Sequence, residues 1–213
     1  MLKRILLLFL FSIAMAYMEA AIVVYLRLLH YPSGFYFPMV VIPGHLALTE
    51  IGREISTLIM IWVIAMLVGQ NFRERFSFFC LTFGVWDLFY YGWLFVLIDW
   101  PATFLDWDIL FLIPLPWIAP WLAPALVSIA LICASLIVLL KPERFNRSIF
   151  NKYEWGIIVL SGLLMLSSFF YQTKNVLNQD IPDYYPWWLF LSGYFIGIFV
   201  FIRRYLNPNL SKS

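Results

Sequence analysis

Charged residues are scarce in this chain of 213 residues. Asp, Glu, Lys and Arg make up 12% of it, about half of the roughly 25% that is usual in soluble domains. Hydrophobic residues make up 63%, and the mean hydropathy is +0.87. A water-soluble fold of this length has too little interior to hide so much apolar surface, whereas lipid can cover it. The composition excludes an ordinary soluble domain and predicts an all-α, polytopic membrane protein.

Cysteine and net charge are also low. The two cysteines, Cys80 and Cys133, lie inside apolar runs and form no CxxC pair. We therefore expect small hydrophobic side chains rather than a disulfide, and no redox compartment follows from them. The net charge is only +2, and no Lys/Arg-rich patch alternates with aromatic residues. This balance argues against a nucleic-acid partner.

Motifs of known catalysts and metal sites are missing. The sequence contains no HExxH, GxSxG, Walker loop or DxDxDG pattern, so no cofactor and no metal is expected. The two histidines, His30 and His45, lie at the predicted outer boundary of the membrane. They could together ligate one zinc ion or haem iron, but lone boundary histidines are more often interfacial side chains.

What the chain does contain is six long apolar stretches. A window of about 19 residues finds them, and backbone groups in lipid must be satisfied within the segment, so each stretch is expected to be a helix. Residues 1–17 resemble a signal peptide, yet the apolar run continues to residue 29, long enough for a full span. We predict one transmembrane domain over residues 1–213. Its spans are 5–29, 46–68, 76–98, 117–140, 155–171 and 186–202.

The basic residues predict an orientation. Eleven fall on one side of the predicted spans and three on the other, which places both termini in the cytoplasm by the positive-inside rule. The larger group consists of Lys3, Arg4, Arg73, Arg75, Lys141, Arg144, Arg147, Lys152, Arg203, Arg204 and Lys212, and the smaller group of Arg27, Arg53 and Lys174.

The segment 98–124 is unusual for an outer loop. It carries five prolines and no Lys or Arg, and proline opposes a regular helix. We expect a short interfacial or re-entrant element on the outer face, followed by a kinked start of the fourth span. Asp106, Trp107 and Asp108 are the candidate residues of this outer cap.

Five ionisable residues interrupt the apolar spans. An ionised side chain in hydrocarbon costs at least about 2.5–3.5 kcal/mol, so such residues usually face a protein interior or a wet cavity. All five fall in the outer half of the predicted membrane or near its middle, which predicts one polar pocket inside the bundle. The five residues are Glu19, Glu50, Arg53, Glu54 and Asp87.

Three interpretations of this cluster stay open. The acids could pack the bundle with Arg27 and Arg53 as neutralising partners. They could instead form an outward-open site for a cation, a proton or a basic ligand, because carboxylates outnumber the nearby arginines. A pair such as Glu54 and Asp87 could also act as acid and base.

The last span carries a small-residue pattern. Gly193 and Gly197 form a GxxxG motif, which can bring two membrane helices into close contact. The motif could face a partner protein or another helix of the same bundle.

Three phrases carry a resemblance. FGVWDLFYYGWLFVLIDWP is followed by LDWDILFLIPLPWIAPWLAP, and EIGRE stands near the start of the second span. Over residues 19–124 the chain resembles a group of uncharacterised bacterial six-span integral membrane proteins. The resemblance implies the membrane fold and a bacterial origin. It also suggests that the five ionisable residues, Asp106 and Asp108 belong to one arrangement.

The sequence favours three functions in order. The first is a non-enzymatic accessory or scaffold subunit of a membrane complex in the bacterial inner membrane, with the lipid bilayer and other membrane proteins as partners. The second is a small transporter or solute- and cation-binding membrane module. The third is an intramembrane lipid-modifying enzyme.

Overall fold

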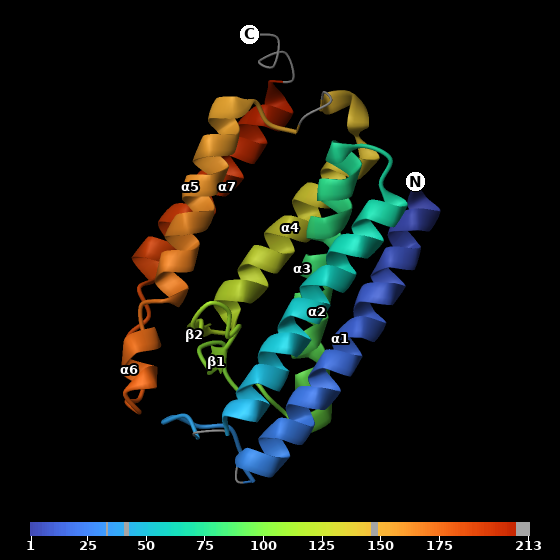
Figure 1. The fold of residues 1–213 in the computed structure, drawn as a ribbon. Coiled ribbons are helices and arrows are strands. Elements are labelled where there is room, and N and C mark those ends of the chain that lie inside the picture. The colour runs from blue at the N-terminus through green and yellow to red at the C-terminus, as the bar shows by residue number, and fades with distance from the viewer. Residues whose placement is uncertain (33, 41–42, 146–148, 208–213) are drawn as a thin grey trace.

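The structure is a computed structural model that describes residues 1–32, 34–40, 43–145 and 149–207. Six of its helices are long and apolar enough to cross a membrane, which confirms the predicted all-α architecture of six spans (Figure 1). These helices are α1 (Leu2–His30), α2 (Gly44–Val68), α3 (Phe72–Ile98), α4 (Leu122–Leu140), α5 (Lys152–Phe169) and α7 (Trp187–Leu206). The shorter elements are β1 (Trp107–Ile109), β2 (Ile118–Pro120), η1 (Pro142–Arg144) and α6 (Thr173–Leu177).

Polar caps explain why two helices begin earlier than hydropathy predicts. The side chain of Asn71 accepts a hydrogen bond from the backbone N–H of Glu74, so α3 begins at residue 72 rather than 76. Asn151 and Glu154 form a capping box, so α5 begins at residue 152 rather than 155. Such caps satisfy backbone donors that have no partner within the helix, and a hydropathy window passes over them because they are polar.

The two ends of the bundle differ in charge. The start of α1 and the end of α7 lie at the same end of the bundle (Figure 1), as an even number of spans requires. The helix ends at this end carry nine of the eleven basic residues grouped by the sequence, and Arg147 and Lys212 fall outside the described residues. We call it the basic end, and the other the opposite end.

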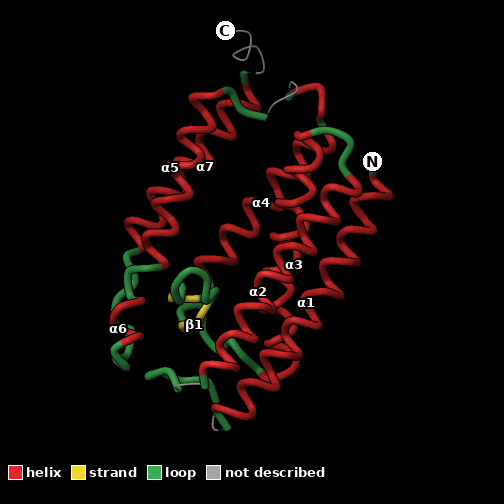
Figure 2. Tube along the Cα trace, viewed as in Figure 1, coloured by secondary structure: helices red, strands yellow, loops and turns green. Residues whose placement is uncertain are grey.

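The helices form two groups. Helices α1 to α4 lie side by side, with α3 packed against α1, α2 and α4, whereas α5 and α7 pair with each other (Figures 1 and 2). The predicted GxxxG motif lies in this second pair: the Ser161 hydroxyl donates to the Gly193 carbonyl over 2.7 Å. A Cβ at Gly193 would lie 2.6 Å from the Ser161 carbonyl oxygen. The motif therefore faces α5 of the same chain.

Apolar clusters join the two groups at both ends. At the basic end, Val138 of α4 packs with Val200 of α7. At the opposite end, Ala123 of α4 packs with Phe169 and Phe190. Helix α4 is therefore the wall shared by the two groups.

The proline-rich segment forms a β-hairpin rather than the expected kinked start of a helix. Strands β1 and β2 are antiparallel, with Asp108 opposite Ala119. Residues 118–120 belong to β2, so α4 begins at residue 122 instead of 117. The Trp121 N–H donates to the Asp106 carbonyl over 3.0 Å, which closes the base of the hairpin. The hairpin positions Asp108 and its own tip against the helices.

Candidate functional site

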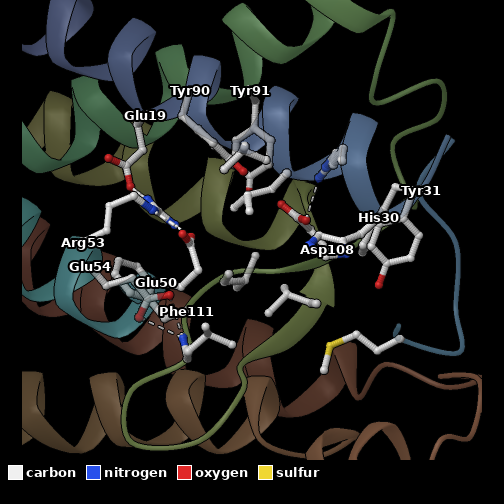
Figure 3. Close-up of a pocket in the computed structure, with 18 of the residues that line it drawn as sticks. Glu19, His30, Tyr31, Glu50, Arg53, Glu54, Tyr90, Tyr91, Asp108 and Phe111 are labelled. Carbon is white, nitrogen blue, oxygen red and sulfur yellow. Dashed lines mark hydrogen bonds and ion pairs between the residues drawn. The ribbon is translucent and has the colours of Figure 1, made fainter. Parts of the chain in front are cut away.

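One polar pocket lies between α1, α2, α3 and the hairpin. Its volume is about 170 Å³, slightly more than an engineered cavity of about 150 Å³ that holds benzene. All five ionisable residues predicted from the spans line it, together with Asp108 and aromatic side chains. Figure 3 labels four of the five, Glu19, Glu50, Arg53 and Glu54, around the pocket with Asp108. The lining includes Glu19, Arg27, His30, Tyr31, Glu50, Arg53, Glu54, Trp86, Asp87, Tyr90, Tyr91, Asp108 and Leu112.

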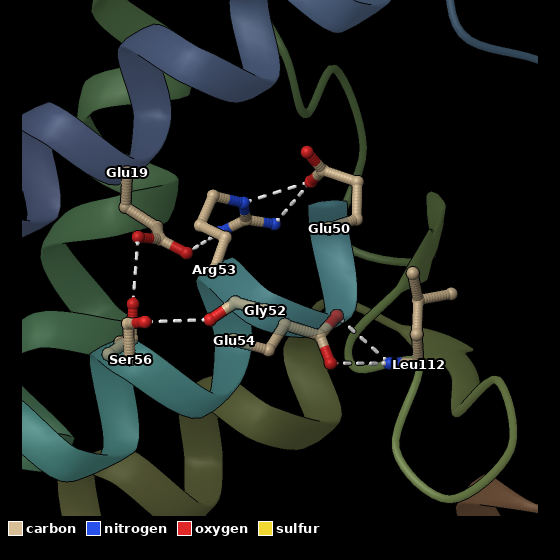
Figure 4. Close-up of polar contacts among 8 residues, drawn as sticks. Glu19, Glu50, Gly52, Arg53, Glu54, Ser56 and Leu112 are labelled. Atoms are coloured by element: carbon tan, nitrogen blue, oxygen red, sulfur yellow. Dashed lines mark hydrogen bonds and ion pairs between the residues drawn. The ribbon is translucent and has the colours of Figure 1, made fainter. Parts of the chain in front are cut away.

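A carboxylate–arginine triad forms one side of the pocket. Arg53 of α2 donates from Nε and Nη2 to Glu50, three residues earlier, over 2.9 and 2.8 Å. Its Nη1 pairs with Glu19 of α1 (Figure 4), and Glu19 also accepts a hydrogen bond of 3.1 Å from the Thr57 hydroxyl. Positions three and four apart share a helix face, so α2 turns Glu50, Arg53 and Thr57 together toward α1. The charge of Arg53 is therefore paired with two carboxylates, those of Glu19 and Glu50.

Glu54 connects α2 to the tip of the hairpin. Both of its carboxylate oxygens lie 2.9 Å from the backbone nitrogen of Leu112, which donates to them (Figure 4). The residue is 6% exposed. Among the described residues, Glu54 forms no ion pair.

Asp87 enters the pocket from α3. Its Oδ2 accepts a hydrogen bond of 2.7 Å from the hydroxyl of Ser128 in α4. Gly84, three residues earlier on the same face, permits this approach, because a Cβ there would lie 2.8 Å from the Ser128 carbonyl oxygen. Within the described part of the chain, Asp87 also forms no ion pair.

A second arginine closes the other side of the pocket. Nη2 of Arg27 lies 3.0 Å from Oδ1 of Asp108, and the guanidinium carbon lies 4.6 Å from the ring centroid of Phe35 and 3.9 Å from that of Trp100. Cation–π contacts of this kind are strongest where the cation is desolvated. Burial raises the pKa of Asp108 to about 6, although the neighbouring Arg27 lowers it.

Three buried polar atoms of the lining residues have no hydrogen-bond partner among the described residues. They are Nη1 of Arg27, Nε1 of Trp86 and Oδ2 of Asp108. Buried polar atoms are nearly always paired with protein or water. A ligand or ordered water in the pocket would satisfy them.

The three residues of the predicted outer cap, Asp106, Trp107 and Asp108, do not all line the pocket. Asp108 lines the pocket, whereas Asp106 accepts hydrogen bonds from Ala102 and Thr103 in an exposed turn. Burial would raise the pKa of Asp106, but the hydrogen bonds from Thr103 and Ala102 outweigh it and hold that pKa below its usual range. Trp107 packs edge-on against Tyr185, with ring centroids 6.1 Å apart. Asp106 and Trp107 therefore support the hairpin outside the pocket.

The two histidines are treated differently by the fold. His30 lines the pocket and His45 does not. No group of three or more His, Cys, Asp or Glu side chains within the described ranges is arranged to hold a metal ion. The zinc or haem ligation shared by His30 and His45 that the sequence left open stays a prediction.

Some lining residues were not among the sequence candidates. Arg27 was expected only as a neutralising partner, although a guanidinium within an apolar span is the same signal that singled out Arg53. Tyr31 and Trp86 give no distinguishing signal in a chain that is 20% aromatic. The role of Ser128 depends on its contact with Asp87, 41 residues away, which no local pattern encodes.

Fold and site together define a multi-pass membrane protein of six helices with a charged pocket near the opposite end of its bundle. Comparison with protein-family models, with curated proteins and with solved structures found no match.

Proposed function

We propose that the pocket binds a small organic cation and that the chain is a solute-binding or transport module of the membrane. One observation carries this proposal. Five carboxylates and two guanidiniums line the pocket, and both guanidiniums already pair with Glu19, Glu50 and Asp108. Glu54 and Asp87 also line the cavity, and among the described residues no cation forms an ion pair with either of them.

The charge balance favours a positively charged occupant. Isolated charges are expensive in a low-dielectric interior, and an unpaired carboxylate there takes up a proton or attracts a cation. A cation that entered would replace the proton on such a group. Binding of solute and release of a proton would then be linked, as proton-coupled transport requires.

The size and walls of the pocket favour an alkylammonium ion. A cavity of about 170 Å³ fits a ligand of roughly benzene size. Tyr31, Trp86 and Tyr90 belong to the lining, and aromatic rings attract ammonium groups through cation–π interactions. A bare metal ion would call on several converging oxygen ligands, and no group of three or more His, Cys, Asp or Glu side chains in the described part of the chain is arranged to hold one.

We also propose that the protein lies in a bacterial inner membrane, with both termini in the cytoplasm. The basic helix ends beside the termini support this orientation, since cytoplasmic segments carry an excess of Lys and Arg. The accessory-subunit and lipid-modifying functions predicted from the sequence stay predictions. No contact among the described residues favours either of them over solute binding.

Binding of tetramethylammonium to the purified protein in detergent tests the proposal, with tert-butanol as an uncharged probe of similar shape. Calorimetry should detect binding of tetramethylammonium to the protein and no binding of tert-butanol. Asp87→Asn and Glu54→Gln should each weaken binding at least tenfold, about 1.4 kcal/mol.

Asp180→Asn is the matched control, because Asp180 is exposed in a loop and does not line the pocket. It should bind like the wild type. Unchanged affinity in well-folded Asp87→Asn and Glu54→Gln proteins would refute the proposal, and so would equal binding of the two probes.

A further inference from the structure

A second cavity lies between the two groups of helices, away from the polar pocket. It is a crevice of about 550 Å³ whose lining is almost entirely apolar and comes from α3, α4, α5, α7 and two residues before α5, Ile149 and Phe150. Three of its lining residues, Ile129 and Cys133 of α4 and Ile202 of α7, are exposed. The crevice therefore opens onto the surface that lipid covers in a membrane.

The dimensions of the crevice suit a hydrocarbon chain. By the scale of an engineered cavity of about 150 Å³ that holds benzene, this volume has room for on the order of twenty carbon atoms. The α5/α7 pair meets α4 in apolar clusters at its two ends, and the crevice lies along the helices between them. An acyl chain parallel to the helices would fill this space.

The basic end of the crevice is positively charged. Tyr205 of α7 lines the crevice, and Nζ of Lys141 lies 3.1 Å from its hydroxyl. The guanidinium of Arg144 lies 5.5 Å from the centroid of the same ring. The exposed Glu143 stands between them in sequence, yet no ion pair joins it to Lys141 or Arg144 among the described residues.

The position of these cations is fixed by α3. Arg73 donates from Nη1 to the carbonyls of Pro142 and Phe145 over 3.0 and 2.8 Å. These two bonds hold η1, and with it Arg144, against the start of α3. Because two cations share one tyrosine ring, an anion beside them would relieve their mutual repulsion.

Two buried groups at the same end also have polar atoms without a partner. Ser77 lines the crevice, and its hydroxyl has no hydrogen-bond partner in the described part of the chain. Arg204 is fully buried and bonds through Nε to the carbonyl of Ile149, while its Nη1 and Nη2 have no partner among the described residues. An ester carbonyl inside the crevice could accept from Ser77, and the charge of Arg204 adds to the positive potential there.

We propose that this crevice is a binding site for one glycerophospholipid. An acyl chain lies between α4 and the α5/α7 pair, the ester region reaches Ser77, and the phosphate pairs with Lys141 and Arg144. The lipid completes the contact between the two groups of helices. This site is separate from the polar pocket and does not depend on the function proposed for it.

Native mass spectrometry of the detergent-purified protein tests the proposal with dioleoyl phosphatidylglycerol and with uncharged dioleoylglycerol. We expect one tightly held phosphatidylglycerol per chain and binding of dioleoylglycerol at least tenfold weaker. Gly162→Leu should weaken phosphatidylglycerol binding at least tenfold, because Gly162 lines the crevice and a Cβ there meets no atom within 4 Å. The double variant Lys141→Gln/Arg144→Gln should have a similar effect.

Each variant has a matched control. Gly156→Leu adds the same side chain to α5 at an open position that does not line the crevice, and Lys3→Gln/Lys152→Gln removes two exposed cations from the same end. Both controls should bind like the wild type. Equal losses in controls and test variants overturn the proposal, as do equal binding of the two lipids, no binding by the wild type, or a dimer in place of bound lipid.

Thiol labelling decides the question if Gly162→Leu fails to fold. In a Cys80→Ala background, phosphatidylglycerol should slow the reaction of Cys133 with N-ethylmaleimide at least threefold, because Cys133 lines the crevice. An unchanged labelling rate at saturating lipid overturns the proposal.

Discussion

Acidification should stabilise the protein through one buried aspartate of the hairpin. Burial raises the pKa of Asp108 from 3.8 to about 6, even with Arg27 beside it. The folded protein therefore holds a proton on Asp108 more tightly than the unfolded chain does. By linkage, the free energy of unfolding rises as the pH falls through about 6, and this gain is lost as the pH rises again.

The size of the effect follows from the two pKa values. Each pKa unit corresponds to about 1.4 kcal/mol, so the full contribution of Asp108 below both values is about 3 kcal/mol. Between about pH 7.5 and about pH 5 the same relation gives about 1.4 kcal/mol. For a chain of this length, that is a rise in melting temperature of roughly 3–6 °C.

Thermal unfolding of the detergent-purified protein, followed by tryptophan fluorescence, measures this difference. The wild type should gain stability on acidification relative to Asp108→Asn, which has no group to titrate at that position. Asp106→Asn is the control two residues away: hydrogen bonds hold the pKa of Asp106 below its usual range, so the group stays ionised throughout the window. Parallel pH profiles for the wild type and Asp108→Asn would show that burial does not govern this carboxyl.

Two further substitutions test the packing. Arg53→Gln should lower the free energy of unfolding by about 3–5 kcal/mol, because it leaves the two buried carboxylates of the triad without their cation. Chemical unfolding in detergent measures this loss, and a loss below about 1 kcal/mol would contradict the ion pairs of the triad. Gly193→Ala should cost about 1–3 kcal/mol because its Cβ would meet the Ser161 carbonyl oxygen at 2.6 Å, whereas Gly156→Ala, in open space, should cost nothing in the same assay.

The spans were predictable because lipid imposes a simple rule on composition. The long apolar runs form helices. The ionisable residues that interrupt them, such as Glu19 and Asp87, line one pocket. A charge that is costly in hydrocarbon must find a polar environment. This argument needs no knowledge of which residues are in contact.

The remaining features depend on long-range contacts that no window can encode. Arg27 pairs with Asp108 across 81 positions, and that pairing depends on the hairpin, whose first strand carries Asp108. The proline content excluded a regular helix in this segment, but it did not select a hairpin over an interfacial helix. The crevice was equally hidden, since hydropathy treats a residue that faces lipid and one that faces an apolar cavity alike.

Glu54 offers the sharpest separation of ligand binding from folding. Its carboxylate accepts the backbone N–H of Leu112, so the residue both anchors the hairpin tip and contributes negative charge. Glu54→Gln keeps an acceptor oxygen and removes the charge. Its free energy of unfolding should lie within about 1 kcal/mol of the wild-type value, while its affinity for tetramethylammonium should fall at least tenfold.

Glu54→Ala should behave differently, because it leaves the Leu112 N–H without an acceptor and costs about 1–3 kcal/mol of stability. Unfolding and calorimetric binding, measured on the same preparations of both variants, separate the two roles. If Glu54→Gln lost as much stability as Glu54→Ala, the charge itself would be needed to hold the hairpin, and weakened binding in that variant would report a displaced loop. If Glu54→Gln kept both stability and affinity, the residue would anchor the hairpin and nothing more, and Asp87 would have to attract the cation alone.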